Sequence, residues 1–240
     1  HLTSKRLDLN QLQDWHMPKT EAENSPVDHD VGFSVFNLPF WDMQFKTEIE
    51  QLTYHQYKIN KLNAAIRMTE DRYIHIDTCL MEIADAHFDI TGYFNATDSN
   101  DIYFSPTVYA KNMDVDKFMI KFDNFGQDNL VSENLHGIID CELSGKLHLH
   151  KDLTPMLEKS DFLIDLEAVN GRLENYGPVK YLADYFKDKN LQKIRFDTLR
   201  NTFEFGANIL KIPVMTINSS LGFIELWGEQ HLSESKKMNL

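Results

Sequence analysis

The stretch that decides the fold is residues 43–94, MQFKTEIEQLTYHQYKINKLNAAIRMTEDRYIHIDTCLMEIADAHFDITGYF. Apolar and polar residues alternate along it. For example, one charged side chain stands between Phe45 and Thr47 and another between Thr47 and Ile49. The same alternation returns at intervals of roughly 14 residues, which is typical of consecutive antiparallel strands. The later apolar positions are Leu62, Ala64, Ile66, Met68, Ile74, Ile76, Thr78, Leu80, Phe88 and Ile90. Short polar connections join these segments, so the sequence predicts a β meander.

Each predicted strand has one apolar face and one face of Lys, Glu, His or Asp side chains. An antiparallel sheet of this kind has one polar face in contact with water and one apolar face that must be covered. The pattern therefore predicts a long one-sided sheet.

The charge balance limits the possible partners. The 240 residues include 24 Lys and Arg against 37 Asp and Glu, a formal net charge of −13. Phosphate binding needs a local surplus of basic side chains, and no basic run offsets the deficit. The composition argues against nucleic acid as a partner and against a basic membrane-surface patch. With 42% hydrophobic residues, the chain can bury a core as one large β domain or as two smaller units.

The cysteines and the start of the chain do not identify a compartment. Cys79 and Cys141 have neither CxxC nor zinc-site spacing. Both lie in alternating segments, where a small buried side chain is ordinary. A disulfide between them is the alternative. The sequence starts at His1, without a signal peptide or an apolar run of about 18 residues. We therefore expect a piece cut from a longer chain.

Two kinds of segment depart from the β pattern. Residues 13–31 are polar with two prolines and predict a loop. A helix is predicted over 178–188, because Pro178 suits a first turn and apolar residues then recur at helical spacing. Residues 155–160 predict a shorter helical turn.

The side chains that carry chemistry form no recognisable site. His148 and His150 share a strand face, but no third ligand at a fixed spacing accompanies them, so we interpret them as polar-face residues. The sequence contains no GxSxG elbow, phosphate-binding loop or complete calcium loop. We predict a non-enzymatic protein with no catalytic residues, no cofactor and no metal. A carbohydrate-acting enzyme stays open as an alternative, because the distance between two carboxylates is not visible in a sequence.

The stretch 138–231 carries a resemblance to a known family. It holds the strand pair IIDCELSGKLHLHKDLTP, the segment FLIDLEAVNGRLENYGPVKYLADYF and the closing run IRFDTLRNTFEFGANILKIPVMTINSSLGFIELWGEQHL. The Asn170-Gly171 turn, the Ser219-Ser220-Leu221-Gly222 motif and the closing Leu226-Trp227-Gly228 resemble the C-terminal region of AsmA-like proteins of the Gram-negative envelope.

Two further features bear on this resemblance. Residues 4–12, SKRLDLNQL, and residues 110–118, AKNMDVDKF, form a loose internal repeat that is similar to a recurring AsmA-type element. Ala207-Asn208 departs from the family, which typically has a Gly-containing turn at that place.

The resemblance implies a location and a role. AsmA-like proteins are usually anchored in the inner membrane by one N-terminal helix, which would lie outside this sequence, with their bulk in the periplasm. They are related to bridge-like lipid carriers, whose curved β-sheet forms a long open groove with an apolar inside. The implied role is in lipid transport, lipid homeostasis and outer-membrane biogenesis. The implied partners are phospholipid or another envelope lipid, and envelope proteins.

We therefore expect a mainly β fold with a short helix, in which a curved antiparallel meander forms a groove. The expected division is a β meander over 1–137 and an AsmA-like C-terminal β region over 138–240. The candidate groove residues belong to the closing run and are Phe203, Phe205, Ile217, Leu221, Phe223 and Trp227. The alternative is that these residues pack a closed core, in a scaffold without ligand.

Overall fold

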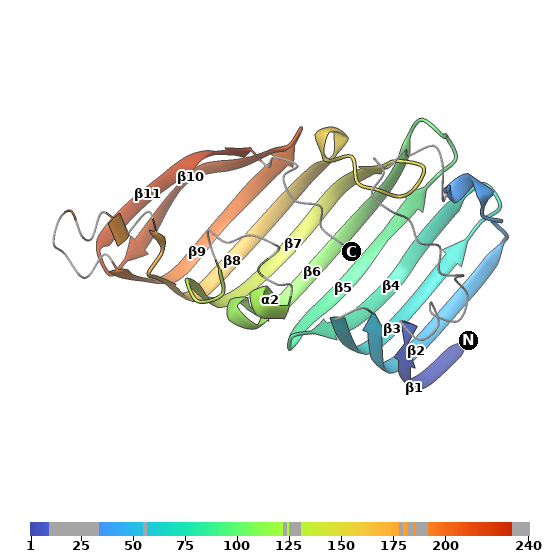
Figure 1. The fold of residues 1–240 in the computed structure, drawn as a ribbon, viewed down its shortest axis with the longest axis horizontal. Helices are drawn as coiled ribbons and strands as arrows, with labels where there is room; N and C mark the ends of the chain where they lie inside the picture. Colours follow the sequence, from blue (N-terminus) through green and yellow to red (C-terminus); the bar gives the residue numbers. More distant parts are fainter. Residues whose placement is uncertain are drawn as a thin grey trace, which may run out of the picture.

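The structure is a computed structural model that describes residues 1–9, 34–54, 57–121, 124, 131–177, 180–181, 185 and 192–231. Eleven strands form one sheet, in which each strand lies beside the next one in the sequence (Figure 1). The strands are β1 (Leu2–Asp8), β2 (Met43–Tyr54), β3 (Tyr57–Met68), β4 (Tyr73–Ile83), β5 (Ala86–Asn95), β6 (Ile102–Asp114), β7 (Leu135–Leu149), β8 (Asp161–Glu174), β9 (Lys193–Gly206), β10 (Ile209–Ser219) and β11 (Gly222–His231).

The sheet is a meander along almost its whole length. Every strand pair from β2 to β11 is antiparallel, and β1 runs parallel to β2. The pattern over residues 43–94 folds as β2 to β5, paired in sequence order. The predicted mainly β fold with little helix is thus confirmed.

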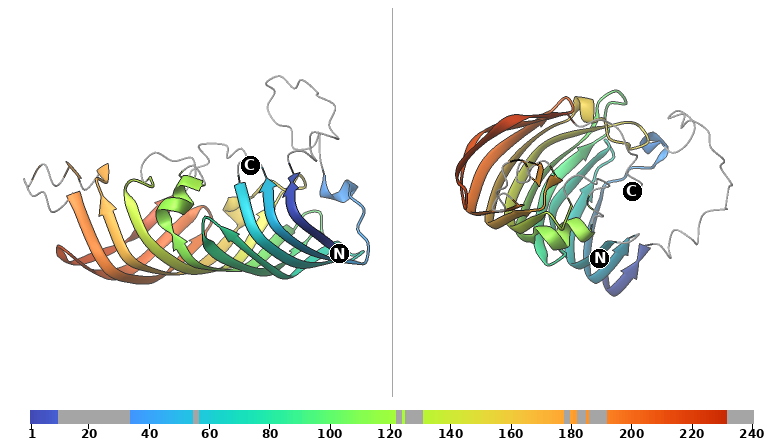
Figure 2. Two further views of the ribbon diagram at one scale, coloured as in Figure 1. Left: turned by 90° about the horizontal axis from the view of Figure 1, so that it is seen from below. Right: turned by 60° about the vertical axis from the view of Figure 1, so that its left-hand side comes forward.

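The sheet is strongly curved into an open trough and is not closed into a barrel (Figures 1 and 2). β1 and β11 lie at opposite ends of the trough, and the strands run across it from rim to rim.

The strand register separates two faces of the sheet, because residues directly opposite each other on neighbouring strands point to the same side. Eight residues pair in series from β2 to β9, and we call them the inner row: Thr47, Ala64, Cys79, Ile90, Val108, Leu143, Ile164 and Phe203. The outer row pairs in the same way beside it: Glu48, Asn63, Leu80, Asp89, Tyr109, Glu142, Asp165 and Thr202. One face of the sheet is therefore largely apolar and the other largely polar.

The apolar face is the concave one. The short helix α2 (Val115–Lys121) lies on the open side of the trough (Figure 2). Its Phe118 ring stacks on Phe88 of β5, with ring centroids 6.0 Å apart. Because Phe88 lies two residues before Ile90 of the inner row, the face that carries the inner row is the one that α2 covers.

At the other rim the 3₁₀ helix η1 (Val35–Asn37) packs against the same face. It begins at Ser34, whose Oγ accepts a hydrogen bond from the N–H of Phe36. Val35, 2% exposed, forms a small buried core with Ala96 and Ile102 at strand ends. The concave face is thus covered by the chain's own residues at this rim.

Helix α2 is held by packing, by one ion pair and by one side-chain hydrogen bond to the sheet. Its buried side chains are Val115 and Met119. Lys117 Nζ lies 2.6 Å from Asp85 in the turn between β4 and β5. Asp116 lies 2.7 Å from Nδ1 of His136 on β7. These contacts connect the helix to both flanking parts of the sheet.

Close strand approach and bulges accompany the curvature. Gly92 on β5 has φ +146°, and a Cβ there would lie 2.4 Å from the carbonyl oxygen of Ser105 on β6. On β6 the register to β7 shifts by one between Ala110 and Met113, where Asn112 has φ 55°. Bulges of this kind bend a strand and increase its twist, and Asn is among the few residues that tolerate the left-handed conformation.

The remaining expectations have different outcomes. The turn predicted over 155–160 is confirmed as the 3₁₀ helix η3 (Leu157–Lys159). In the helix predicted over 178–188, the described residues Lys180, Tyr181 and Tyr185 are helical, and the others lie outside the described part of the chain. The loop predicted over 13–31 also lies outside it. The expected division at residues 137 and 138 falls inside β7, and the sheet continues through it.

Candidate functional site: the concave face of the sheet

The inner row lies within a wider apolar lining. Toward α2 the same face continues with a second series of paired residues: Met81, Phe88, Ala110, Cys141 and Leu166. Toward the other rim it continues with Phe162, Phe205 and Leu210, which pair in series from β8 to β10. The rings of Phe162 and Phe205 lie 6.0 Å apart. The concave face is therefore apolar in three neighbouring rows.

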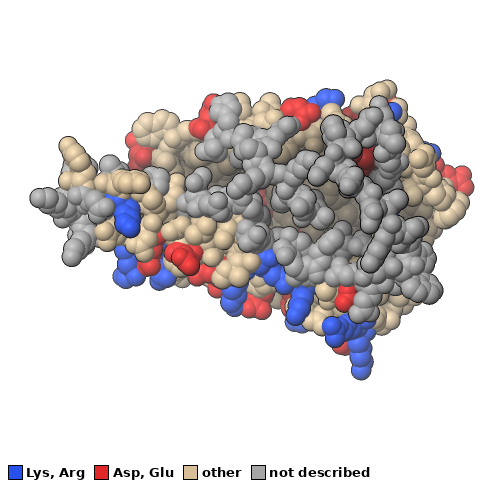
Figure 3. Space-filling model, viewed as in Figure 1, with Lys and Arg blue, Asp and Glu red and all other residues tan. Residues whose placement is uncertain are grey.

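This face is hollowed rather than flat. Where it is visible in the view onto the open side, the recess is lined mainly by uncharged residues, and most of the visible charged side chains lie at the margins (Figure 3). The middle residues of the inner row, Ile90, Val108, Leu143 and Ile164, are half-buried. An apolar, concave surface of this kind is the usual chemistry of a site for an apolar ligand.

Both cysteines belong to this face. Cys79 lies in the inner row and Cys141 in the neighbouring series, and both are free thiols. Burial raises the pKa of each thiol above its ordinary value, and the charge of Asp89 adds to this for the pKa of Cys79. The two thiols are therefore natural reporters of what occupies the concave face.

The structure brings three of the six predicted groove residues onto the apolar face. Phe203 is the last member of the inner row, and Phe205, 7% exposed, pairs with Phe162 and Leu210 on the same face. Ile217 on β10 pairs with Ile224 on β11. Leu210 is opposite Gln230 on β11, so the even-numbered residues of that strand, Ile224 among them, share the concave face.

The other three predicted residues lie elsewhere. Phe223 and Trp227 are odd-numbered residues of β11 and point to the outer face, where they are 82% and 62% exposed. Leu221 lies in the turn between β10 and β11, and its N–H donates to Ser219 Oγ. Sequence patterning placed all six together because a strand shows which residues alternate, whereas the face each set meets is decided by neighbouring strands.

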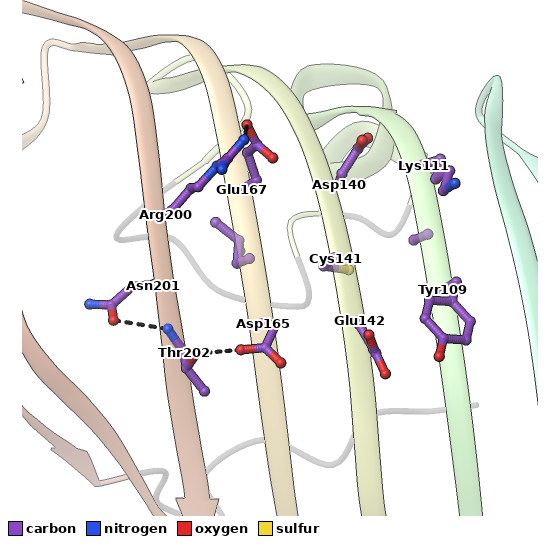
Figure 4. A pocket seen from close by; sticks show the side chains of 12 residues that line it. Tyr109, Lys111, Asp140, Cys141, Glu142, Asp165, Glu167, Arg200, Asn201 and Thr202 are labelled. Atoms are coloured by element: carbon purple, nitrogen blue, oxygen red, sulfur yellow. Dashed lines mark hydrogen bonds and ion pairs between the residues drawn. The ribbon is translucent and has the colours of Figure 1, made fainter.

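The outer face has a shallow pocket of about 610 Å³ across β6 to β9 (Figure 4). Four carboxylates gather there, with Glu142 opposite Asp165 and Asp140 opposite Glu167. Each has a partner, which limits the repulsion expected between like charges. The carboxylate contacts are Arg200 Nη2 with Glu167 at 2.6 Å, the N–H of Asn112 with Asp140 at 2.7 Å, the Thr202 hydroxyl with Asp165, and Tyr109 with Glu142. The hydrogen bond to Glu142 raises the pKa of Tyr109.

The histidines are engaged in local contacts. His148 Nε2 lies 3.2 Å from Asp101, and its ring lies 6.0 Å from that of Tyr103. His75 stacks on Tyr73 at 5.6 Å. Among the residues that the structure describes, no three His, Cys, Asp or Glu side chains are grouped so as to hold a metal ion.

Sequence reasoning missed the middle of the lining. Cys79, Val108, Leu143 and Ile164 were not among the candidate groove residues, although the first of them stands in the decisive alternating stretch. The signal was present as period-two alternation, but only the cross-strand register shows that these residues form one row.

Comparison with family models, with curated proteins and with solved structures finds no match to this chain. Within the described part of the chain, no helix is long and apolar enough to cross a membrane.

Proposed function

We propose that this protein binds lipid acyl chains on the concave face of its sheet. The observation that supports the proposal is the unbroken inner row, which crosses eight strands of an open, one-sided sheet. A continuous apolar strip of this kind matches the shape of an extended hydrocarbon chain.

The energetics favour such a ligand. Moving a methylene group from water to an apolar surface is worth about 0.8 kcal/mol, so even a partly covered acyl chain gains several kcal/mol. The net charge of −13 keeps such a carrier soluble and away from anionic headgroups. The outer row, with Glu48, Asp89, Glu142 and Asp165, places part of this charge on the convex face.

We place this activity in the cell envelope. The resemblance of residues 138–231 to AsmA-like proteins supports a periplasmic role in lipid transport, lipid homeostasis or outer-membrane assembly, in a parent anchored in the inner membrane. The partners in this proposal are phospholipid or another envelope lipid, and envelope proteins. The proposed role requires no catalytic residue, cofactor or metal.

A scaffold without ligand is the second candidate. The packing of η1 supports it, because Val35, Ala96 and Ile102 fill one rim of the concave face with the chain's own side chains. On this alternative the exposed Phe223 of the outer face serves protein partners.

Two adjacent residues of β8 allow a matched test. Ile164 belongs to the inner row, whereas Leu163, 42% exposed, pairs with Ser144 and Glu204 on the outer face. We expect Ile164→Asp to abolish stoichiometric phospholipid binding, because a carboxylate would be desolvated against the acyl chain. Leu163→Asp introduces the same charge one residue away and should leave binding unchanged. Native mass spectrometry after incubation with phosphatidylethanolamine vesicles measures the bound lipid.

The outcomes separate the two candidates. Loss of lipid in Ile164→Asp alone, with circular dichroism showing an intact sheet in both variants, supports the lipid-binding role. Equal binding in both variants would place the lipid elsewhere, and an unmodified protein without lipid would favour the scaffold.

A further inference from the structure

The ladder between β9 and β10 is interrupted. The two strands pair at one end, where residues 204–206 meet 209–211, and at the other end, where Phe196 meets Ser219. Between these ends residues 197–203 have no partner on β10, and residues 212–218 have none on β9, within the described range 192–231. β9 nevertheless stays paired to β8, and β10 to β11. We call this gap, visible as two diverging strands in Figure 1, the β9–β10 opening.

Pro213 lies within the interruption and contributes to it. Its carbonyl oxygen accepts a hydrogen bond from Asn201 on β9, so its backbone polar groups face that strand. In an antiparallel pair a residue uses its N–H and its carbonyl on the same side, and proline has no N–H. A rung of the ladder is therefore missing on the side where β10 would pair with β9.

A pocket of about 630 Å³ lies at this opening. Its wall combines apolar side chains, among them Val214 and Trp227 at 64% and 62% exposure, with the charged Lys211 and Glu229. Ile212, which also lines it, is opposite Gly228 on the concave side of β11. The pocket therefore adjoins the outer surface and is bounded by a residue that belongs to the concave side.

We infer that the β9–β10 opening is a lateral passage through which a phospholipid acyl chain reaches the concave face from the outer side of the sheet, in parallel with direct entry over the open side of the trough. The inference rests on the proposed lipid-binding function and adds the route of entry. The lining suits an amphipathic molecule, because the apolar side chains can contact the acyl chain while Lys211 and Glu229 stay beside the headgroup. The volume lies within the range of ordinary ligand sites, roughly 300–1,000 Å³.

A disulfide that narrows the passage from its paired end tests the inference. Glu204 and Lys211 are the last paired residues before the opening, and the next position in the same register would pair Phe203 with Ile212. Phe203→Cys with Ile212→Cys therefore adds a covalent link at the edge of the opening. Cys79→Ala and Cys141→Ala remove the native thiols from the background. The same protein is compared oxidised and reduced. The measurements are the rate at which pyrene-labelled phosphatidylethanolamine leaves phosphatidylethanolamine vesicles for the protein, and the amount bound at equilibrium.

A second disulfide provides the control. Leu163→Cys with Glu204→Cys links β8 to β9, which are already paired at these residues. We expect oxidation to slow transfer at least about twofold in the first protein, because it hinders the lateral route while the open side of the trough stays accessible. Oxidation should not change the rate in the control. Equal rates in oxidised and reduced forms of the first protein would overturn the passage while leaving lipid binding intact.

The equilibrium measurement separates the two proposals. If the unmodified chain binds no phospholipid, the proposed function fails and the passage fails with it. If the unmodified chain and the reduced proteins all bind phospholipid, the oxidised-to-reduced rate ratio decides the passage. If only the unmodified chain binds, its transfer rate compared with that of Pro213→Val decides the passage.

A variant without engineered cysteines tests the passage independently. Pro213→Val supplies the N–H that faces β9, so we expect the ladder to extend and transfer to slow. Amide hydrogen exchange of residues 197–203 reports whether the strands have paired. Slower amide exchange with an unchanged transfer rate would also overturn the passage.

Discussion

Asn201 on β9 donates a hydrogen bond from Nδ2 to the carbonyl oxygen of Pro213 on β10, over 3.4 Å. The Oδ1 of the same side chain accepts the N–H of Thr202 at 2.8 Å. One side-chain amide thereby satisfies two backbone groups where the ladder between the strands is interrupted. Asn201 therefore supplies a partner for two backbone groups that lie beside the β9–β10 opening.

Replacing Asn201 by Leu should lower stability, because it leaves the Thr202 N–H and the Pro213 carbonyl without this partner. We expect a loss of about 1–2 kcal/mol in the free energy of unfolding. Urea unfolding measures it, and amide exchange of Thr202 should become faster. Asn218→Leu is the control, since Asn218 is an exposed amide on β10 and should change stability little. Equal losses in the two variants would remove the special role of Asn201.

Gly92→Ala should be strongly destabilising. Its φ of +146° disfavours a side chain, and the added Cβ would lie 2.4 Å from the Ser105 carbonyl oxygen. Together these effects should cost roughly 2–4 kcal/mol. Gly206→Ala has open space around the added Cβ and should change little. Chemical denaturation compares them, and a small effect at Gly92 would show that β5 and β6 can move apart.

Arg72→Ala should loosen η1. The guanidinium carbon lies 5.0 Å and 5.3 Å from the ring centroids of Phe36 and Phe40. Loss of the two cation–π contacts should cost about 1–2 kcal/mol, with Arg72→Lys retaining part of them. Amide exchange of residues 34–40 locates the effect. Unchanged exchange there would mean that Val35 packing alone holds this rim.

Packing rather than charge should hold α2. Met119 is 6% exposed, so Met119→Ala should cost about 2–5 kcal/mol, as for other buried methionines. The ion pair of Lys117 with Asp85 is solvent-exposed, and such pairs are usually worth about 0–1 kcal/mol. Urea unfolding of Met119→Ala and Lys117→Ala gives the two values. A larger loss for Lys117→Ala would reverse the assignment.

The thiols of Cys79 and Cys141 should react slowly near neutral pH. Their pKa values are raised by burial, so at a given pH less of each thiol is the reactive thiolate. Alkylation by iodoacetamide should therefore accelerate as pH rises through and above the ordinary thiol pKa of about 8.5. Added phosphatidylethanolamine vesicles should slow it further if lipid occupies the concave face.

The control for this experiment is Leu163→Cys on the outer face. That thiol should react quickly, and its alkylation rate should not change when lipid is added. Equal protection of all three thiols would point to an effect of the vesicles on the reagent rather than to occupancy of the trough.

The fold was largely predictable, and the site only in part. Alternation in β2 to β5 is local information, because a strand's two faces are set by a period of two in the sequence. The predicted lining near Phe203 and Phe205 follows from the same period. The large apolar side chains of Phe223 and Trp227 predict groove residues, whereas the register turns them outward.

The sequence by itself determined that this chain is a one-sided β meander, because each strand carries its own apolar and polar faces. Tertiary structure alone decided that eight strands align Cys79, Ile90, Ile164 and their paired neighbours in one concave row. It also decided that β9 and β10 separate beside Pro213. Register and curvature arise from the pairing of each strand with its neighbours, and the alternation within a single strand does not contain them.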